Sequence, residues 1–550
     1  MQQRLLRATL VYVVFVFVLV SGAIATETKK PIRVFLFAGQ SNMVGADADA
    51  RKIDEYPPFV GAAEELDEVP FAYFTRSNES DGWEALKPIG NQFGPELTFA
   101  RRLLEAQDGP IAIIKCSVGG TTAAFDWNPD APANGQALFP RAVRKIRESL
   151  DELRKRGRPV ELTAMFWHQG ENDMLNRDLV KDYAANLRRI IDAFGEQLEA
   201  PDLPWFVGEV SDKGIWGMDH RSNMRQLREQ QRKLIDEDPL LTFVPTSHLA
   251  FEVMGSGQPH YHFGTQGQLQ HGWAYADAFL RSTGESERRT TDDTVLRRFP
   301  AKKDSVVPVF ILAGARNVEG EDAFVAELTG RDKQLARENR RVLYRAARGS
   351  WTTSLAWMPL QPSGSFGNFG PELSLGAQLA KDAPIVLIQL AESAAQISDW
   401  DPEAKDANRP VYARALETIQ EALTDLRKRG FKPRLEAVFW HHGENECYYT
   451  PFRRRYASIF ERVVATLRSD LERPDLDWIV ALHSDRSPWG EENVREMNES
   501  LRAVSDRDSH LSIFETSDLS HARIHFGTEG TVELGRRFAE RYKSLVKARK

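Results

Sequence analysis

The chain of 550 residues has only 2 cysteines, Cys116 and Cys447. Two isolated cysteines exclude the disulfide framework that stabilises small secreted domains. An excess of positive charge is also missing, because 72 Lys and Arg residues stand against 79 Asp and Glu residues, for a net charge of −7. The sequence therefore lacks the electrostatic footprint of a nucleic-acid-binding protein, and no nucleic-acid partner is expected.

Long apolar runs are absent beyond the first residues of the chain. Arg4 and Arg7 precede an apolar run over 8–20, and Ala23-Ile24-Ala25 has the small-x-small pattern of a cleavage site. The run is shorter than the about 20 residues that a membrane span needs. We expect residues 1–25 to be a signal peptide and the mature protein to be secreted or periplasmic, without membrane contact. An uncleaved signal that anchors the chain in the membrane is the alternative.

Three motifs occur twice, in the same order, which indicates an internal duplication. The second copy follows the first by 276, 273 and 263 residues at the three motifs. The pairs are Phe93-Gly94-Pro95-Glu96-Leu97 and Phe369-Gly370-Pro371-Glu372-Leu373, Phe166-Trp167-His168-Gln169-Gly170-Glu171-Asn172 and Phe439-Trp440-His441-His442-Gly443-Glu444-Asn445, and His262-Phe263-Gly264-Thr265 and His525-Phe526-Gly527-Thr528. This pattern predicts two domains, 32–283 and 306–546, joined by a polar linker at 284–305.

Within each copy, short apolar runs alternate with longer amphipathic segments. In the first copy we expect strands at 33–38, 110–116, 161–167, 204–210 and 241–245. Helices are expected at 94–106, 138–156, 178–198, 220–236 and about 265–282. Continuous apolar strands that alternate with helices predict an α/β fold with a parallel sheet covered on both faces. A sheet of this kind binds its ligand beyond the carboxyl ends of the strands.

Ser41 follows the apolar run 34–37 directly and is the candidate nucleophile. A serine hydroxyl needs a neighbouring base for activation. His262, just before the last helix of the copy, is the candidate base. The candidate oxyanion donors are the backbone N–H groups of Ser41 and of Gly119 or Gly120, and the side-chain amide of Gln169. Each signal alone is weak, but all of these groups are expected at carboxyl ends of strands, where one fold brings them together.

The set Gly-Gln-Ser-Asn-Met at 39–43, Gly-Gly-Thr at 119–121, Trp-His-Gln-Gly-Glu at 167–171 and the late His-Phe pair resembles the sialate O-acetylesterase and carbohydrate esterase family six group of the SGNH hydrolase superfamily. The resemblance implies tandem three-layer α/β/α, flavodoxin-like domains with parallel sheets. It also implies cofactor- and metal-free hydrolysis of acetyl esters on carbohydrates, and assigns the nucleophile to Ser41, the oxyanion donors to Gly119 or Gly120 and Gln169, and the base to His262.

The sequence departs from this superfamily at the acid that orients the histidine. An Asp commonly stands three residues before the histidine, but Pro259 occupies that position here. Glu171 matches the glutamate of the family-six motif, so we expect a Ser41–His262–Glu171 triad, with a bare Ser–His dyad as the alternative. A buried ion pair is the competing interpretation of Glu171. Asn42 and Trp127 are further candidates for substrate contact.

The second copy lacks most of this constellation. Arg316 replaces the serine, Ser393-Ala394 falls near the Gly-Gly position, and His442 replaces Gln169. We therefore expect residues 306–546 to be a degenerate, inactive domain. It is either a structural partner or a retained sugar- or anion-binding site with Arg316 and Trp400 as contacts.

Two rival functions are compatible with parts of the sequence. His260, His262 and His271 lie close together, but no carboxylate has ligand spacing, so no metal site is expected. A non-catalytic carbohydrate-binding protein built on an esterase fold is the second rival. The expected partner is an acetylated carbohydrate of the sialate or xylan type; the sequence specifies neither the sugar nor the oligomeric state.

Overall fold

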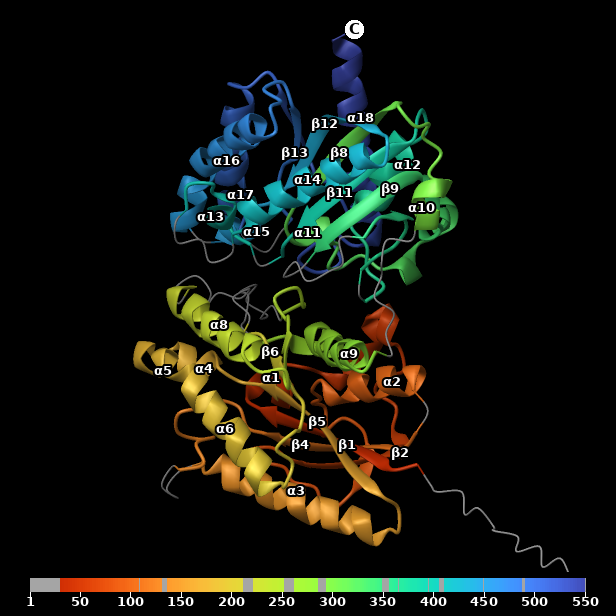
Figure 1. Ribbon diagram of the computed structural model, residues 1–550. Coiled ribbons are helices and arrows are strands. Elements are labelled where there is room, and N and C mark those ends of the chain that lie inside the picture. Colours follow the sequence, from red (N-terminus) through yellow and green to blue (C-terminus); the bar gives the residue numbers. More distant parts are fainter. Residues whose placement is uncertain are drawn as a thin grey trace, which may run out of the picture.

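The computed structural model describes residues 30–107, 109–130, 136–210, 221–251, 262–284, 293–348, 356–364, 366–393, 395–404, 410–448, 450–486 and 490–549. The predicted signal peptide, Pro259 and His260 lie outside these residues. Figure 1 shows two α/β domains that follow one another along the chain. We call them domain 1, up to α9, and domain 2, from β8 onward.

Domain 1 is built on a seven-stranded sheet of order β3-β2-β4-β1-β5-β6-β7. The strands are β1 (Ile32–Gly39), β2 (Leu66–Phe74), β3 (Glu84–Leu86), β4 (Ile111–Ser117), β5 (Val160–His168), β6 (Trp205–Gly208) and β7 (Leu241–Val244). All neighbours pair in parallel except β3, which runs antiparallel to β2. The predicted parallel α/β architecture is confirmed, with one antiparallel strand at its edge.

Helices cover both faces of this sheet. They are α1 (Ser41–Val44), α2 (Glu96–Ala106), α3 (Leu138–Lys155), α4 (Glu171–Met174), α5 (Arg177–Lys181), α6 (Tyr183–Gln197), α8 (Arg221–Asp236) and α9 (Gly264–Ser282), with 3-10 turns η1 (Ala50–Glu55) and η2 (Pro57–Phe59). Alternate residues of β1 point to opposite faces. Val34 and Leu36 pack with α3, α6 and α8, whereas Phe35 and Phe37 pack with α2 and α9. This alternation explains the uninterrupted apolar run of β1.

Strands β2 and β3 were not expected from the sequence. The run over 66–74 carries acidic residues and Pro70, which is typical of a strand that cannot complete a ladder on both sides. In the structure this run pairs with β4 only from Phe71 onward, and its start pairs with the short β3. The proline thus lies on the outer, less regular part of the sheet.

Domain 2 repeats this architecture with sheet order β10-β9-β11-β8-β12-β13-β14. Its strands are β8 (Val306–Gly314), β9 (Asn339–Arg348), β10 (Met358–Leu360), β11 (Ile385–Ala391), β12 (Lys432–His441), β13 (Asp477–Ala481) and β14 (Leu511–Phe514). Its helices are α11 (Arg316–Glu319), α12 (Glu372–Leu379), α13 (Ile397–Trp400), α14 (Val411–Lys428), α15 (Glu444–Tyr448), α16 (Thr450–Asp470), α17 (Glu491–Ser505) and α18 (Thr528–Ala548), with η3 (Val325–Glu327) and η4 (Gly330–Ala336). The two sheets have the same order position for position, as a duplication requires.

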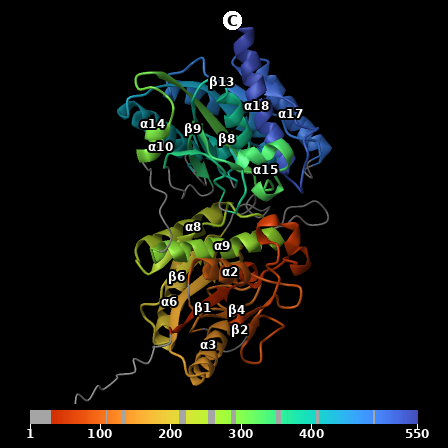
Figure 2. The ribbon, with the colours of Figure 1, turned by 90° about the vertical axis from the view of Figure 1, so that its right-hand side faces the viewer.

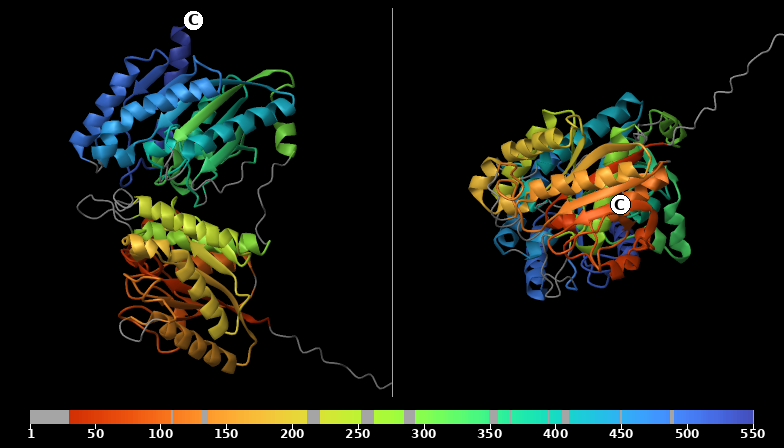
Figure 3. Two further views of the ribbon diagram at one scale, coloured as in Figure 1. Left: turned by 60° about the vertical axis from the view of Figure 1, so that its left-hand side comes forward. Right: turned by 90° about the horizontal axis from the view of Figure 1, so that it is seen from below.

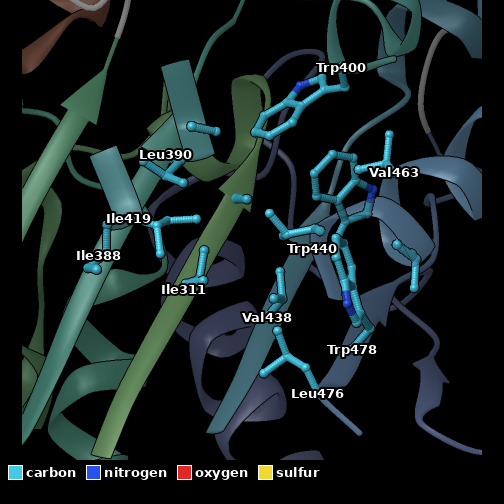
Figure 4. Packing of buried hydrophobic residues seen from close by; sticks show 14 of the residues in the cluster. Ile311, Ile388, Leu390, Trp400, Ile419, Val438, Trp440, Val463, Leu476 and Trp478 are labelled. Carbon is cyan, nitrogen blue, oxygen red and sulfur yellow. The ribbon is translucent and has the colours of Figure 1, made fainter. Parts of the chain in front are cut away.

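In the core of domain 2 three tryptophan rings, those of Trp400, Trp440 and Trp478, pack one against the next (Figure 4). The Trp400 and Trp440 rings meet edge to face at 4.9 Å, and the Trp440 and Trp478 rings lie 5.7 Å apart. Trp400 is buried among α14, α16 and β12. The hypothesis that Trp400 contacts a sugar is therefore wrong, because its ring is part of the core.

The segment predicted as the linker contains ordered structure at its carboxyl end. Helix α10 (Asp293–Arg298) lies there, and Phe299 is buried in the core of domain 2. Within the described residues, no helix is long and apolar enough to span a bilayer.

The two domains are stacked so that the carboxyl edge of each sheet faces the other domain (Figures 1 and 2). Helices α8 and α9 of domain 1 lie at this junction, and a second direction of view shows the same stacking (Figure 3). Phe366 of domain 2 packs into the aromatic core of domain 1, where it lies 6.4 Å from the Trp273 ring. The junction is thus a packed interface that places both predicted ligand edges side by side.

Candidate active site

The register of three strands brings the predicted site loops together. Gly39 at the end of β1 pairs with Ser117 at the end of β4 and with His168 at the end of β5. Gly39 has φ of +148°, and a β-carbon there would lie 2.0 Å from the His168 carbonyl oxygen. Only glycine permits this approach. The residues that follow the three strands therefore emerge at one point of the edge.

Ser41 opens α1 at this point, and 7% of the residue is exposed. A β-carbon added to Gly119 would lie 3.4 Å from Ser41 Cβ, so the Gly119 backbone lies directly against the serine. The guanidinium of Arg76 donates to the Gly119 carbonyl oxygen at 2.6 Å and fixes this loop from β2. Gly120, the other glycine of the pair, has φ of +73°, which favours glycine.

His262 lies at the same edge and is paired with a carboxylate. Its Nδ1 lies 2.7 Å from Asp47 Oδ2, and its side chain is 11% exposed against 42% for Asp47. Asp47 has φ of +63° in the loop after α1, a conformation that Asp tolerates better than most residues. A carboxylate on Nδ1 keeps the proton there and leaves Nε2 as the basic atom.

The predicted Ser41–His262–Glu171 triad needs correction, because Glu171 holds other partners. Its Oε1 accepts from Asn42 Nδ2 at 2.7 Å and lies 2.9 Å from His168 Nε2. Burial alone would raise the pKa of Glu171, but His168 and these hydrogen bonds hold the pKa below its ordinary value. Glu171 is therefore part of a buried polar network, and Asp47 occupies the place on His262 that we had assigned to it. The predicted alternative of a bare dyad does not fit this contact either.

Asn42 connects the serine and histidine segments. Besides donating to Glu171, its Oδ1 accepts from Phe263 N at 3.1 Å, and its backbone oxygen accepts from Gln268 Nε2 at 2.8 Å. The residue after Ser41 is thus bonded to the residue after His262. Asn42 is only 2% exposed, so its side chain serves this framework rather than the predicted substrate contact.

The Gln169 amide, which is predicted to be an oxyanion donor, is hydrogen-bonded inside the protein. Its Nε2 lies within hydrogen-bonding distance of Gln40 Oε1 (3.2 Å), the Thr121 carbonyl oxygen (2.9 Å) and Asp173 Oδ2 (2.5 Å). Two amide hydrogens already have three acceptors, and the residue is fully buried. The hydrogen bonds of Gln169 therefore do not support its predicted role as an oxyanion donor.

Asn172 is a polar group at the site that we did not single out from the sequence. Its Nδ2 lies 3.7 Å from the place of a β-carbon on Gly120. In domain 2 its counterpart Asn445 accepts at 2.8 Å from the guanidinium of Arg316, the residue at the nucleophile position. In domain 2 the side chain at this position therefore reaches the residue that begins α11. Its recurrence as Glu171-Asn172 and Glu444-Asn445 was a signal available in the sequence.

Two further residues belong to the core: Trp127, a predicted substrate contact, and His271, named in the rejected metal-site alternative. Trp127 is fully buried, donates from Nε1 to Thr121 Oγ1 at 3.2 Å and meets the Trp167 ring edge to face, so the predicted substrate contact is wrong. His271 is also fully buried, between His168 and Tyr275. Burial, with the neighbouring His168, holds the pKa of His271 well below its ordinary value and keeps the ring neutral.

The corresponding edge of domain 2 has different chemistry. Arg316 is 1% exposed, and burial lowers its pKa although several carboxylates surround it. Asp322, the counterpart of Asp47, is bonded to Arg523 rather than to a histidine. His525 Nε2 lies 3.3 Å from Glu321 Oε2 instead. The nucleophile is absent, and the aspartate and the histidine have separate partners.

The chain is similar to several known proteins. Residues 31–281 and 306–544 both match the family described as "Carbohydrate esterase, sialic acid-specific acetylesterase". A probable carbohydrate esterase of Arabidopsis thaliana is 26% identical over 262 residues, which cover 46% of this chain and 91% of that relative. Among solved structures, NanS is 14% identical with a TM-score of 0.36, covering 47% of this chain and 99% of NanS. A carbohydrate acetylesterase of Xanthomonas citri is 14% identical with a TM-score of 0.34, covering 44% of this chain and 57% of that enzyme.

The two matches to the family model together span most of the chain. The protein therefore belongs to the carbohydrate esterase family of sialic acid-specific acetylesterase type, and carries the family's domain twice. The family that we identified from the sequence is thereby confirmed, as is the class of enzyme, a carboxylic ester hydrolase.

Proposed function

We propose that domain 1 removes O-acetyl groups from carbohydrates through an acyl-enzyme formed on Ser41, and that the protein is secreted. The observation that carries the proposal is the 2.7 Å contact between His262 and Asp47, together with the hydrogen bond that joins the neighbours of Ser41 and His262, Asn42 and Phe263. Family membership supports the acetylated carbohydrate, and the predicted signal peptide supports secretion.

The reaction would proceed in two half-reactions. His262 Nε2 takes the Ser41 proton while Oγ bonds to the acetyl carbon, and the carbonyl oxygen becomes an oxyanion. The bond to the sugar oxygen then breaks, and His262 gives its proton to that oxygen. In the second half, His262 takes a proton from water, the resulting hydroxide attacks the acetyl carbon, and acetate leaves as Ser41 regains its proton. Asp47 would orient the imidazole and stabilise its charged form throughout.

We assign the oxyanion donors to the backbone N–H groups of Ser41 and of Gly119 or Gly120, together with the Asn172 side-chain amide. The close approach of Gly119 to Ser41 supports the first two. Donors fixed before the reaction stabilise developing charge without reorganisation. In domain 2 Arg316 cannot act as a nucleophile, because a guanidinium does not lose its proton, so we assign the hydrolysis to domain 1 alone.

The test is acetate release from 4-nitrophenyl acetate and acetylated xylan by the full chain, compared with Ser41→Ala. The variant should lower kcat by about 10⁴- to 10⁶-fold, since loss of a serine nucleophile has effects of this size. A serine-reactive fluorophosphonate should label the wild type and not the variant. Activity that survives in Ser41→Ala would refute the mechanism. A wild type without activity or labelling would instead favour a non-catalytic carbohydrate-binding protein.

A further inference from the structure

Domain 2 contacts domain 1 on the segments on either side of His262. The connection from β7 to α9 carries this histidine, and α9 begins two residues after it. Three separate contacts from domain 2 reach this stretch. All of them come from the edge of domain 2 that corresponds to the active site of domain 1.

The first contact is made by the residue that replaced the nucleophile. The Arg316 Cζ atom lies 4.3 Å from the centroid of the Phe251 ring, on the connection between β7 and His262. Phe251 is 7% exposed, so the guanidinium lies against a desolvated ring. A planar cation over an aromatic face is a favourable contact, and more so away from water. Asn445, which accepts from Arg316 Nη2 at 2.8 Å, fixes the guanidinium from its own domain.

The second contact lies just beyond His262. Gln266, in the first turn of α9, donates from Nε2 to the Glu321 carbonyl oxygen at 3.1 Å and is 1% exposed. The third contact lies before Phe251, where the Phe366 ring stacks on His248 with 5.7 Å between centroids and an interplanar angle of 4°. Ala250, next to Phe251, is itself bonded to α9, because its N–H donates to Gln270 Oε1 at 2.8 Å. Domain 2 therefore contacts the described residues on both sides of His262, at 248–251 and in the first turn of α9.

The loop that carries Asp47 is held by domain 2 as well. Arg523 Nη1 donates to the hydroxyl of Tyr56 at 3.3 Å, and its Cζ lies 5.2 Å from the Tyr56 ring. Tyr56 directly follows η1 on the Asp47 side of the site. The same arginine is bonded to Asp322, the counterpart of Asp47. Residues near both members of the His262–Asp47 pair are thus hydrogen-bonded to domain 2, Gln266 on the His262 side and Tyr56 on the Asp47 side.

We propose that the degenerate domain has become a part of the active site of domain 1, in which Arg316 is a positioning residue that holds the start of α9, and with it His262, through Phe251 and Ala250. This inference rests on the proposed function of His262. It gives the degenerate site a role that does not need a ligand. A retained anion-binding site at Arg316 is disfavoured, because Glu321, Glu444 and Glu319 surround its guanidinium and would repel an anion.

The test compares Arg316→Gln and Arg316→Lys with a matched control in the full chain. The control is Arg345→Gln. Like Arg316, Arg345 lies over an aromatic ring, but this ring, Trp357 at 5.5 Å, belongs to domain 2 itself, so the contact does not join the two domains. The measurements are kcat and KM on 4-nitrophenyl acetate, the pH profile of kcat/KM, and amide hydrogen exchange of residues 248–251 and 263–270.

Both Arg316 variants should lower kcat by about 10- to 100-fold with little change in KM, because a misplaced catalytic group has costs of this order. Arg316→Lys keeps the charge and loses the planar stacking, so it should not rescue the loss fully. The limb of the pH profile that reports the base should shift, and amide exchange should become faster in both stretches. Arg345→Gln should lower only the thermal midpoint.

The inference is overturned if the Arg316 variants change stability alone, with kcat, the pH profile and exchange at 248–251 and 263–270 as in the wild type. Failure of the proposed function has a different signature, since the wild type would then release no acetate and take up no fluorophosphonate. In that case unchanged exchange would still refute the interdomain hold, and faster exchange would support it.

Discussion

Domains 1 and 2 share one sheet order, but residues have been exchanged between them both in the buried scaffold and at the site edge. The exchange in the scaffold is compensated by another residue, and the exchanges at the site edge are not. In domain 1 Glu96 is paired with Lys115 at 2.8 Å. In domain 2 the lysine position holds Gln389, and Arg348 from β9 supplies the cation to Glu372 at 2.5 Å. In both domains this glutamate also accepts from the glycine two residues before it. The exchange is compensated, so the scaffold keeps its buried ion pair.

The exchanges at the site edge are not compensated in this way. Arg316 replaces Ser41, and the counterparts of Asp47 and His262 have separate partners. By contrast Glu171, which recurs as Glu444, lies near a histidine in both domains, His168 at 2.9 Å and His441 at 3.9 Å. The glutamate–histidine pair is thus retained in both domains, whereas in domain 2 the serine is lost and the retained aspartate and histidine no longer pair with each other. Because the counterpart of Glu171 keeps a histidine neighbour in a domain without the serine, this contact does not depend on a catalytic triad.

The comparison is tested most severely at Asp47. Asp47→Asn should keep the loop but allow the wrong imidazole tautomer, and lower kcat by about 10²- to 10⁴-fold. The measurement is kcat on 4-nitrophenyl acetate. Asp49→Asn is the matched control, because Asp49 lies on the same loop and its carboxylate pairs with Arg51 at the surface. A larger loss in Glu171→Gln than in Asp47→Asn would restore the triad expected from the sequence.

The scaffold side of the comparison is tested by placing the residue of domain 2 in domain 1. Lys115→Gln reproduces Gln389 without the compensating arginine, and leaves Glu96 buried and uncompensated. The expected loss is about 3–5 kcal/mol in the free energy of unfolding, measured by urea denaturation. The double variant Glu96→Gln/Lys115→Gln should lose less than the single variant.

The control for this prediction is a partly exposed ion pair of the same domain. Arg102→Gln removes the contact of Arg102 with Asp277 at 3.1 Å, where the side chains are 36% and 24% exposed. Its cost should stay at about 0–1 kcal/mol, the usual range for pairs near the surface. Equal losses in the free energy of unfolding of Lys115→Gln and Arg102→Gln would contradict the view that the buried pair contributes more to stability than a partly exposed one.

A smaller effect is expected at Asn172, the oxyanion donor that we infer from the repeat. Asn172→Ala should lower kcat by about 10²- to 10³-fold with KM nearly unchanged, as for other oxyanion donors. Asn128→Ala is the control, since that amide makes local contacts with the backbone, donating to the Ala124 oxygen at 3.0 Å and accepting from Asp130 N at 3.0 Å. If Gln169→Ala reduces kcat without loss of stability while Asn172→Ala does not, the sequence-based assignment of Gln169 is correct after all.

The sequence predicted the parallel-sheet architecture because its central strands are buried on both faces and read as unbroken apolar runs. Ser41 could be chosen because it follows a predicted strand, and His262 because it begins a repeated motif just before a predicted helix. Asp47 could not be chosen from the sequence, because it lies in an irregular loop. It is 215 residues from His262 in the chain, so only the fold brings the two together. Its recurrence as Asp322, six residues after Arg316, was visible, but spacing alone did not reveal its partner.

The misassigned residues share one physical cause. Gln169, Trp127 and Asn42 carry polar groups of the kind that bind ligands, but each of these groups is used inside the protein. A motif shows which polar residues recur, and it does not show whether their hydrogen bonds are already satisfied. That information depends on neighbours far apart in the chain, such as Asn42 and Phe263.

The smallest expected effect is a change in the pH dependence of stability at Asp173. This carboxyl group has a counterpart in domain 2, Glu446. Asp173 accepts from Ala123 N at 3.0 Å, and Glu446 makes the matching contact with Ile397 N at 2.5 Å. Burial raises the pKa of Asp173 to about 6, against hydrogen bonds from Gln169 and Ala123 that lower it. A carboxyl group with a raised pKa binds its proton more tightly in the folded state than in the unfolded chain. Its contribution to stability is therefore present at low pH and is lost as pH rises through the folded pKa.

Asp173→Asn cannot ionise and should escape this loss. The free energy of unfolding of the variant, relative to the wild type, should rise by up to about 3 kcal/mol between pH 4 and pH 7, as a pKa raised by about two units requires. Urea denaturation across this range measures the difference, and Asp151→Asn, an exposed carboxylate paired with Arg154, should show no such trend. A wild type that gains stability over the variant as pH rises would mean that Asp173 is ionised and held by Gln169, so that the Gln169 amide is even less available to an oxyanion.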